Sequence, residues 1–219
     1  MGTLVSFDMI KHAKKKLEAD GCRTLVVGAS GAIGSILLQM LKKYNGHVTA
    51  VCSGTNAENC TRLGANEVVD YTIKPFGDQL VEQKKEKFDV VFDLVGGKQT
   101  EAQSKPLLKK GAMYVTAVGD NMYMGMDRVL SCGEFCGSCC GLMYRSCCGC
   151  CSSYKYVMSQ GAYPPMKEEI WKPSVVESGA RALIAEEVPF SEAPLRKAMT
   201  RVLSHHAGGR VVINLEIRD

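Results

Sequence analysis

A glycine-rich segment near the N-terminus, TLVVGASGAIGSILLQMLKKY at residues 24–44, constrains the fold of this chain more than any other feature. Residues 24–27 form a short apolar run that predicts a buried strand, and apolar residues at 36–41 recur with helical spacing. Between them, small residues permit a tight turn and a close approach of the backbone to a pyrophosphate, at Ala29, Gly31 and Gly34. The segment therefore predicts the strand, turn and helix of a dinucleotide site.

A second predicted strand, His47–Cys52, ends where such a site recognises the adenosine ribose, about 20 residues beyond the turn. An NAD site usually has an acidic residue at this point, but this segment is polar and uncharged, with Ser53, Thr55 and Asn56. Because no carboxylate of the segment would repel a 2′-phosphate, we expect NADP(H), although no neighbouring arginine or lysine supports that choice. A nucleotide-shaped fold that binds nothing is the alternative.

The alternation of strands and helices continues to residue 118. We expect further strands at 67–71, 88–94 and 113–118, further helices at 57–63, 79–85 and 99–109, and a first helix capped by Ser6 that ends near 20–21. Such alternation predicts an α/β fold with a doubly wound, Rossmann-like parallel sheet and helices on both faces. Glycines at the ends of two strands mark the edge where ligands bind, at 96–97 and at Gly119.

Composition excludes several classes of protein. The 219 residues are 46% hydrophobic and 23% charged, as in an ordinary globular chain. The net charge of +4 comes from lysine clusters without interleaved aromatic residues, so we expect no nucleic acid partner. No apolar run reaches the roughly 18 residues of a membrane span. The odd number of cysteines, 11, and the lack of a signal peptide favour a reducing compartment.

Eight of the cysteines lie in one stretch, CGEFCGSCCGLMYRSCCGCC at residues 132–151. The spacing of Cys132, Cys136 and Cys139 is that of an iron–sulfur site, and two C-x2-C pairs could bind zinc. However, cysteine, methionine and tyrosine side chains also recur every three or four positions, at Cys132, Cys136, Cys139, Met143, Cys147, Cys150 and Tyr154. This spacing predicts an amphipathic helix within 129–158. Because free cysteine packs as a small hydrophobe, we favour packing over a metal site, and lipidation is a third possibility.

The order of several motifs resembles a known family. LVVGASGAIG, VTAVCS, RLGANEVVDY, FDVVFDLVGG and LLKKGAMYVTAVG follow one another as in the cofactor domain of medium-chain dehydrogenases/reductases. The resemblance is to the quinone-oxidoreductase branch, which includes the mitochondrial reticulon-interacting oxidoreductases. Near the C-terminus, VPFSEAPLRKAMTRVLSHHAGGRVVIN is similar to the closing strand, helix and strand of that family.

The resemblance implies a set of cofactor-binding residues. The pyrophosphate would lie on Ala29, Ser30, Gly31, Ala32, Ile33 and Gly34. Ser53 and Thr55 would face the 2′-phosphate, with Tyr71 nearby, and Val95, Val118 and Gly119 would border the nicotinamide. We assign no catalytic residue, because the histidines fit structural roles better and the family uses the position of Asp93 for architecture.

The resemblance also predicts three regions: an N-terminal helix at 1–22, a dinucleotide-binding domain at 23–160 that includes the Cys/Gly-rich helix, and a C-terminal segment at 161–219. In the family, that last segment completes a GroES-like catalytic domain, which we expect this chain to lack. Its strands, near 185–190 and 210–213, would then have unpaired edges. We therefore expect other protein chains to bind at these strands and at the Cys/Gly-rich helix.

Two functions are consistent with this sequence. The first is an NADP(H)-dependent reductase of quinones or enones whose substrate cleft is completed by a partner chain. The second is a catalytically inactive accessory subunit of a large, mitochondrial assembly. We expect a mitochondrial or cytoplasmic location.

Overall fold

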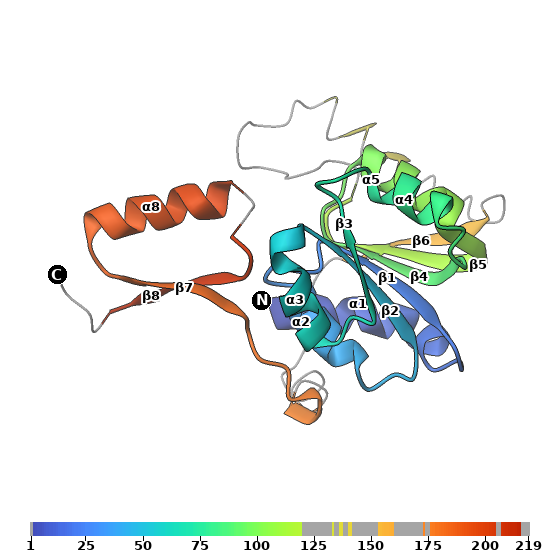
Figure 1. The fold of residues 1–219 in the computed structure, drawn as a ribbon, viewed down its shortest axis with the longest axis horizontal. Helices are drawn as coiled ribbons and strands as arrows, with labels where there is room; N and C mark the ends of the chain where they lie inside the picture. The colour runs from blue at the N-terminus through green and yellow to red at the C-terminus, as the bar shows by residue number, and fades with distance from the viewer. Residues whose placement is uncertain are drawn as a thin grey trace.

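A six-stranded parallel sheet with the strand order β3-β2-β1-β4-β5-β6 organises most of the chain (Figure 1). The computed structural model describes residues 2–119, 133, 136–137, 140–141, 153–159, 173, 176–204 and 207–215. The strands of the sheet are β1 (Arg23–Val27), β2 (His47–Cys52), β3 (Glu67–Asp70), β4 (Phe88–Asp93), β5 (Leu108–Thr116) and β6 (Tyr154–Met158). The prediction of a doubly wound, Rossmann-like sheet is confirmed.

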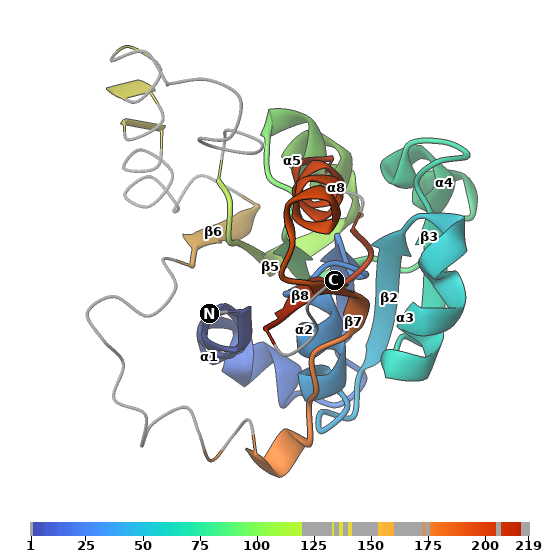
Figure 2. The same cartoon turned by 90° about the vertical axis from the view of Figure 1, so that its left-hand side faces the viewer.

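Helices cover both faces of the sheet (Figures 1 and 2). One face carries α1 (Gly2–Leu17), α2 (Gly34–Leu41) and α3 (Ala57–Leu63), and their apolar residues form one core with the sheet. The other face carries α4 (Phe76–Glu82), α5 (Lys98–Ser104) and the 3₁₀ turn η2 (Lys105–Leu107). Apolar residues of α4 and η2 help form the second core. The short 3₁₀ turn η1 (Gly54–Asn56) joins β2 to α3.

The first helix begins earlier than expected. α1 starts at Gly2, so Ser6 lies inside the helix and does not cap it. Its buried hydroxyl donates instead to the carbonyl oxygen of Ile33, at 3.2 Å, in the turn before α2. Ser6 therefore ties α1 to the predicted phosphate turn.

Two other boundaries differ from the expectation. The predicted helix at 99–109 ends at Ser104 and tightens into η2, because Pro106 cannot continue the α-helical hydrogen bonds. The following strand, β5, accordingly begins at Leu108, five residues before the predicted 113.

The expected helix at 129–158 is wrong at its C-terminal end. Residues 154–158 form β6, which pairs in parallel with β5 from Ala112↔Tyr154 to Thr116↔Met158. Strand alternation explains this: Tyr154 and Tyr156 are buried, Lys155 is exposed, and Tyr156 stacks on Tyr114 at 5.5 Å.

The described residues of the cysteine stretch are helical at 133, 136–137 and 140–141. Cys136, which we expected on a buried stripe, is exposed, because no described element covers it. At this position, packing does not explain the cysteine. Cys132, Cys139, Met143, Cys147 and Cys150 lie outside the described residues.

The C-terminal unit consists of β7 (Ile184–Pro189), α8 (Glu192–Leu203) and β8 (Arg210–Asn214). β7 and β8 pair in parallel with each other, with α8 as the crossover, so the expectation that both strands lack a partner is wrong. The unit stands to one side of the six-stranded sheet, beyond α3 (Figure 1). Gln39 of α2 links the preceding segment to the sheet domain, because its side chain bonds the amide and the carbonyl of Arg181, at 3.0 and 2.8 Å.

Candidate functional site

The carboxyl edge of the sheet brings together all the predicted cofactor-binding segments. The strands end level with one another, since Val27 pairs with Val51 and Asp93, Asp93 with Thr116, and Cys52 with Asp70. The residues that follow these strands therefore share one edge. They are Ala29, Ser30, Gly31, Ala32, Ile33 and Gly34 after β1, Ser53 and Thr55 after β2, Tyr71 after β3, Val95 after β4, and Val118 and Gly119 after β5.

The turn between β1 and α2 has the shape of a phosphate cradle. Gly28 has a φ of +79°, and the amides of Gly28 and Ala29 both donate to the carbonyl oxygen of Val51, at 3.1 Å. A Cβ atom on Gly34 would lie 2.6 Å from the carbonyl oxygen of Ala29, so only glycine allows α2 to start this close to the turn.

The amides at the start of α2 point to an anion site. In the described part of the chain, no backbone acceptor receives the amides of Ala32, Ile33 and Gly34, whereas the Ser35 amide donates to the Gly31 carbonyl at 2.9 Å. Free amides at a helix N-terminus bind phosphate oxygens and add the partial positive charge of the helix. This arrangement fits the pyrophosphate of a dinucleotide.

The end of β2 forms a cluster of polar side chains. The hydroxyls of Ser53 and Thr55 lie 3.1 Å apart, and the amide nitrogen of Asn56 donates to the Ser53 hydroxyl at 2.9 Å. Sequence reasoning noted Asn56 only as uncharged, whereas the structure makes it the residue that positions Ser53. The C-terminal unit also reaches this cluster, since a Cβ atom on Gly208 would lie 3.1 Å from Asn56 Oδ1.

A carboxylate from the next strand also reaches this cluster. Asp70, the last residue of β3, lies beside the turn after β2, since a Cβ atom on Gly54 would be 2.3 Å from Asp70 Oδ2. The local sequence after β2 contains no carboxylate, as the prediction of NADP(H) assumed, whereas this one comes from the neighbouring strand β3. The signal that could have found Asp70 is its position at the end of a neighbouring parallel strand. Tyr71, which follows it, is 42% exposed.

Asp93 organises the other half of the edge. Its Oδ1 accepts from the amides of Val95 and Gly96, at 3.0 and 2.8 Å, and its Oδ2 accepts from the hydroxyls of Tyr114 and Thr116, at 2.7 and 3.2 Å. Burial, followed by the Asp93 carboxylate, raises the pKa of Tyr114, so this phenol is a hydrogen-bond donor and not a base.

Thr116 extends this network to the last predicted site residues. Its hydroxyl accepts from the amides of Val118 and Gly119, at 3.2 and 3.1 Å, and the Gly97 amide donates to the Gly119 carbonyl at 2.8 Å. The side chain of Val95 lies against Gly28, where a Cβ atom would be 3.0 Å away. Asp93 is therefore architectural, because it shapes the loops that carry Val95, Val118 and Gly119.

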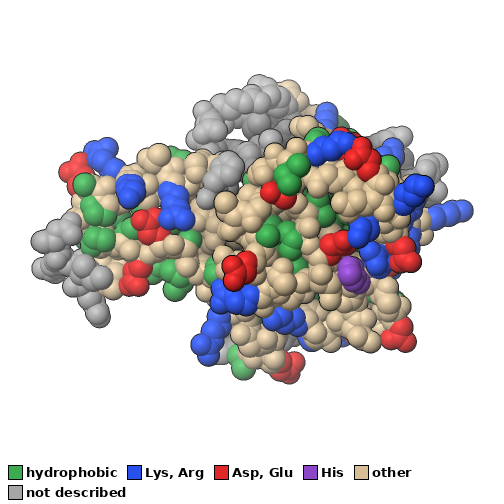
Figure 3. Space-filling view, in the orientation of Figure 1, with side chains coloured by type: hydrophobic (Ala, Val, Ile, Leu, Met, Phe, Trp, Pro, Cys, Tyr) green, Lys and Arg blue, Asp and Glu red, His purple; other side chains and the backbone are tan. Residues whose placement is uncertain are grey.

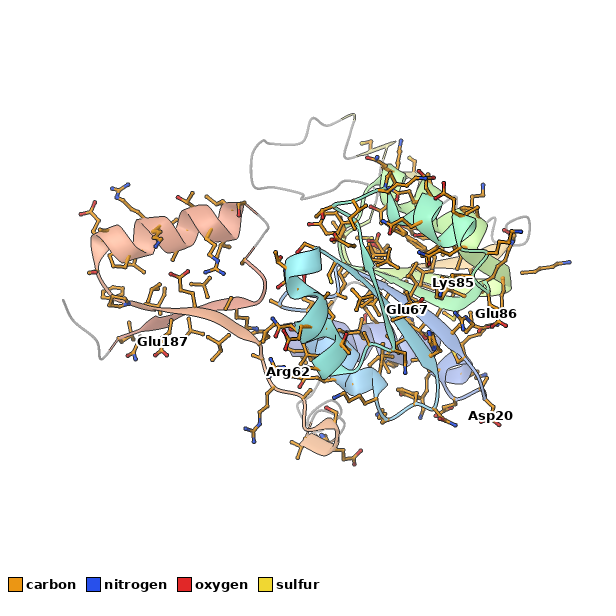
Figure 4. All side chains as sticks on the ribbon, viewed as in Figure 1. Asp20, Arg62, Glu67, Lys85, Glu86 and Glu187 are labelled. Carbon is orange, nitrogen blue, oxygen red and sulfur yellow. The ribbon has the colours of Figure 1, made fainter. Side chains whose placement is uncertain are left out.

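The amino edge of the sheet has a different character. Glu67 is paired with Lys85 and lies 3.7 Å from His47, and Arg23 lies 3.6 Å from Glu86; Figure 4 shows Glu67, Lys85 and Glu86 gathered there. A hollow of about 380 Å³ lies between these residues. Burial would raise the pKa of Glu67, but Lys85 and His47 together lower it. Charged side chains of both signs therefore line this edge, and none of the predicted cofactor-binding residues lies there.

Metal ligands do not converge in the described part of the chain. None of its His, Cys, Asp and Glu residues form a group of three or more that could hold an ion. His12 and His47 each lie near one carboxylate, at 3.6 and 3.7 Å, and residues 205–206 lie outside the described residues. We therefore derive no step that uses zinc. Among the described helices, none has the length and apolar character needed to cross a membrane.

Comparison with known proteins identifies relatives of this chain. The family model described as zinc-binding dehydrogenase matches residues 32–135. The mouse and human proteins named NAD(P)H oxidoreductase RTN4IP1, mitochondrial, are 36% and 35% identical over 210 residues. Both alignments include 89% of this chain and 48% of the relative, so the chain spans about half the length of these proteins. The medium chain reductase pydE of Acremonium sp is 28% identical, over 89% of this chain and 52% of the relative.

Solved structures share the fold. CurA from Vibrio vulnificus, described in complex with NADPH, matches with a TM-score of 0.70 and 17% identity, over 100% of this chain and 63% of that one. The quinone oxidoreductase of Coxiella burnetii matches with a TM-score of 0.65 and 17% identity, over 96% and 58%. At these identities the likeness concerns the fold alone, whereas the sequence matches concern the family. This chain contains a domain of the zinc-binding dehydrogenase family, the medium-chain dehydrogenases/reductases that its motifs resemble.

Proposed function

We propose that this chain is the NADP(H)-binding domain of an oxidoreductase of the quinone-oxidoreductase type. The observation that carries the proposal is the cradle after β1, where the amides of Ala32, Ile33 and Gly34 lack backbone acceptors beside a glycine-tight turn. The names of the RTN4IP1 relatives include NAD(P)H, and the CurA structure is described with NADPH; both support the same cofactor.

The residues of the carboxyl edge would bind and orient this cofactor. The cradle would hold the pyrophosphate, Ser53 and Thr55 would lie at the adenosine ribose, and Val95 and Val118 would border the nicotinamide. The bound cofactor supplies hydride, and the protein contributes binding, orientation and the exclusion of water. We assign no catalytic residue, since the buried polar group nearest the nicotinamide end, Asp93, is fully engaged in architecture.

We further propose that the substrate cleft is completed by another polypeptide region that binds at the C-terminal unit. That unit exposes several large apolar side chains, at Ile184, Phe190, Met199, Val202, Leu203, Ile213 and Leu215. Figure 3 shows green hydrophobic side chains on the surface of this part of the molecule. Exposed apolar residues gathered on one unit are typical of a contact surface. The roughly twofold greater length of the RTN4IP1 relatives supports a further region of this kind.

The same exposed residues favour a second candidate, an accessory subunit without turnover in a larger assembly. In that case the nucleotide would serve to stabilise the fold, since any ligand of the folded state does so by mass action. We propose a mitochondrial location for either function, supported by the names of the RTN4IP1 relatives.

Calorimetric titration with NADPH tests the cofactor site. We expect the purified chain to bind with a dissociation constant below about 1 mM, which corresponds to about −4 kcal/mol. Gly31→Asp would place a carboxylate in the cradle, where a Cβ atom has room, and should weaken binding at least about 10-fold. The charge-matched control is Gln83→Glu, at the exposed end of α4 before β4 and thus at the opposite edge, which should leave the affinity unchanged. Equal effects of the two variants would contradict the site.

Native mass spectrometry of the protein from its source separates the two candidate functions. A chain that carries NADP(H), and that reduces quinones once its bound partner is present, supports the reductase. A chain recovered only within a large assembly that shows no NADPH oxidation supports the accessory subunit.

A further inference from the structure

We propose that Asp70 is a specificity-determining residue of the nucleotide site, whose carboxylate opposes the 2′-phosphate so that the chain binds NADH and NADPH with similar affinity. The inference rests on the proposed function, because it concerns the adenosine end of the same site. The new point is the residue that determines the choice between NADH and NADPH, which the proposed function leaves open.

The carboxylate of Asp70 is held by two donors of Thr72. Its Oδ1 accepts from the amide and from the hydroxyl of Thr72, at 2.8 and 2.6 Å. Gly54 lies close to the other oxygen, since a Cβ atom added to it would be 2.3 Å from Oδ2. The carboxylate therefore lies against the turn after β2, although it comes from β3.

This position coincides with the predicted adenosine subsite. Cys52 and Asp70 pair at the ends of β2 and β3, and the amide of Tyr71 donates to the carbonyl of Cys52 at 3.2 Å. Gly54, which contacts Asp70, lies between Ser53 and Thr55, the two residues whose hydroxyls were assigned to the ribose end. The charge therefore lies beside the group that distinguishes NADPH from NADH.

The carboxylate is ionised and without a compensating cation. The hydroxyl of Thr72, its amide and the amide of Gly54 lower the pKa of Asp70 below its ordinary value. None of the ion pairs among the described residues includes Asp70. A 2′-phosphate beside it would meet a like charge, whereas the ribose hydroxyls of NADH could donate to it, as they do to the acidic residue of other dinucleotide sites.

The expected size of this effect is modest because Asp70 is exposed to solvent. A like charge several ångströms away in water changes an affinity by about 3- to 10-fold. The hydroxyls and amides of the Ser53–Thr55 turn act in the opposite direction, as donors to a phosphate. We therefore expect the dissociation constants of NADH and NADPH for the natural chain to differ by less than about 10-fold.

Titration of the Asp70→Asn variant with both nucleotides tests the proposal. Asparagine keeps the shape and one acceptor oxygen but removes the charge. The ratio of the NADH to the NADPH dissociation constant should rise about 3- to 10-fold, and this rise should shrink in 0.5 M salt, where charges are screened. If the role of Asp70 were merely structural, Asp70→Asn would weaken the binding of both nucleotides alike and leave the ratio of their dissociation constants unchanged.

The matched control is Asp20→Asn, which makes the same change of charge just before β1, at the opposite edge (Figure 4). It should leave the ratio unaltered. An unchanged ratio in Asp70→Asn, with both nucleotides still bound, overturns the role of Asp70 and leaves the proposed cofactor site intact. A natural chain that prefers NADPH more than about 10-fold also overturns the proposed role of Asp70. A natural chain that binds neither nucleotide overturns both proposals.

Discussion

The six-stranded domain and the C-terminal unit use the same local pattern, a parallel pair of strands joined by a helix, yet they differ in what covers them. In the domain, every residue of β1 after Arg23 is buried, and α2 is buried at seven of its eight residues. In the C-terminal unit, the buried hydrophobic residues are Val188 and Ala198, while Phe190, Met199 and Leu215 are 60%, 63% and 68% exposed.

This difference shows that secondary structure and stability have separate origins in this chain. The hydrogen bonds of β7 and β8 form a ladder of the same kind as those of β1 and β2. However, a ladder contributes little net free energy by itself, since the unfolded chain bonds to water instead. Burial of apolar surface supplies most of the stability, at about 25 cal/mol per Å². The C-terminal unit buries little apolar surface among the described residues, so we expect it to be the less stable of the two regions.

Hydrogen exchange measures the free energy of opening at individual amides, and we expect it to give the largest difference between the two regions. Amides of β1 and β4 should exchange only by global unfolding, which costs about 5–15 kcal/mol in a domain of ordinary stability. Amides of β8 should open locally at about 2 kcal/mol or less. Similar protection of the two regions in the isolated chain would contradict the lower stability of the C-terminal unit.

Removal of a buried hydrogen-bond centre should have the next largest effect. Asp93→Ala would leave four donors without an acceptor, and we expect a loss of about 4 kcal/mol in urea unfolding. In the C-terminal unit, Glu186→Ala removes the partner of Arg201 at 2.7 Å, on a partly exposed surface. That loss should stay below about 1 kcal/mol. If Asp93→Ala does not fold, Asp93→Asn should give a smaller, measurable loss.

A pair of identical substitutions isolates the contribution of burial. Leu38 of α2 is fully buried, and Leu203 of α8 is 46% exposed. Leu38→Ala should destabilise the chain by about 3 kcal/mol, because it removes a core side chain and leaves a cavity. Leu203→Ala should change the stability by no more than about 0.5 kcal/mol. Helix propensity changes little and equally in both, so equal losses would refute the distinction between the two regions.

The pH dependence of one ion pair should give the smallest effect. Burial would raise the pKa of Asp89, but the Arg23 amide at 3.0 Å and Lys109 at 2.8 Å together lower it. The folded pKa thus lies below the unfolded one, so the stabilisation is present above about pH 4 and is lost as the pH falls through the folded pKa.

Asp89→Asn should therefore cost up to about 1 kcal/mol at pH 7 and nothing at about pH 2. Its counterpart in the C-terminal unit, Glu192→Gln, removes an exposed pair with Arg196 and should change the stability at neither pH. A cost of Asp89→Asn that persists in acid would point to packing and not to charge.

Prediction from sequence succeeded where one local signal was sufficient. The glycine-rich turn and the strands β1, β2 and β4 carry their own apolar runs, so their places were predictable to within a residue or two. The strand β6 was missed because Tyr154 also continues the helical spacing that begins at Cys132, and only pairing with β5 distinguishes a strand from a helix there. The start of α1 was missed because Ser6 resembles a cap until its bond to Ile33 is known.

The sequence by itself determined the class of fold, the phosphate turn and the edge at which the candidate site lies, because these follow from local periodicity and from the small size of glycine. Tertiary structure alone decided the rest. It brought Asp70 from β3 to a turn after β2, engaged Asp93 with two donors of the following loop and two of β5, and paired β7 with β8. The physical reason is that parallel strands adjacent in space are distant in sequence, so contacts at their ends leave no local pattern.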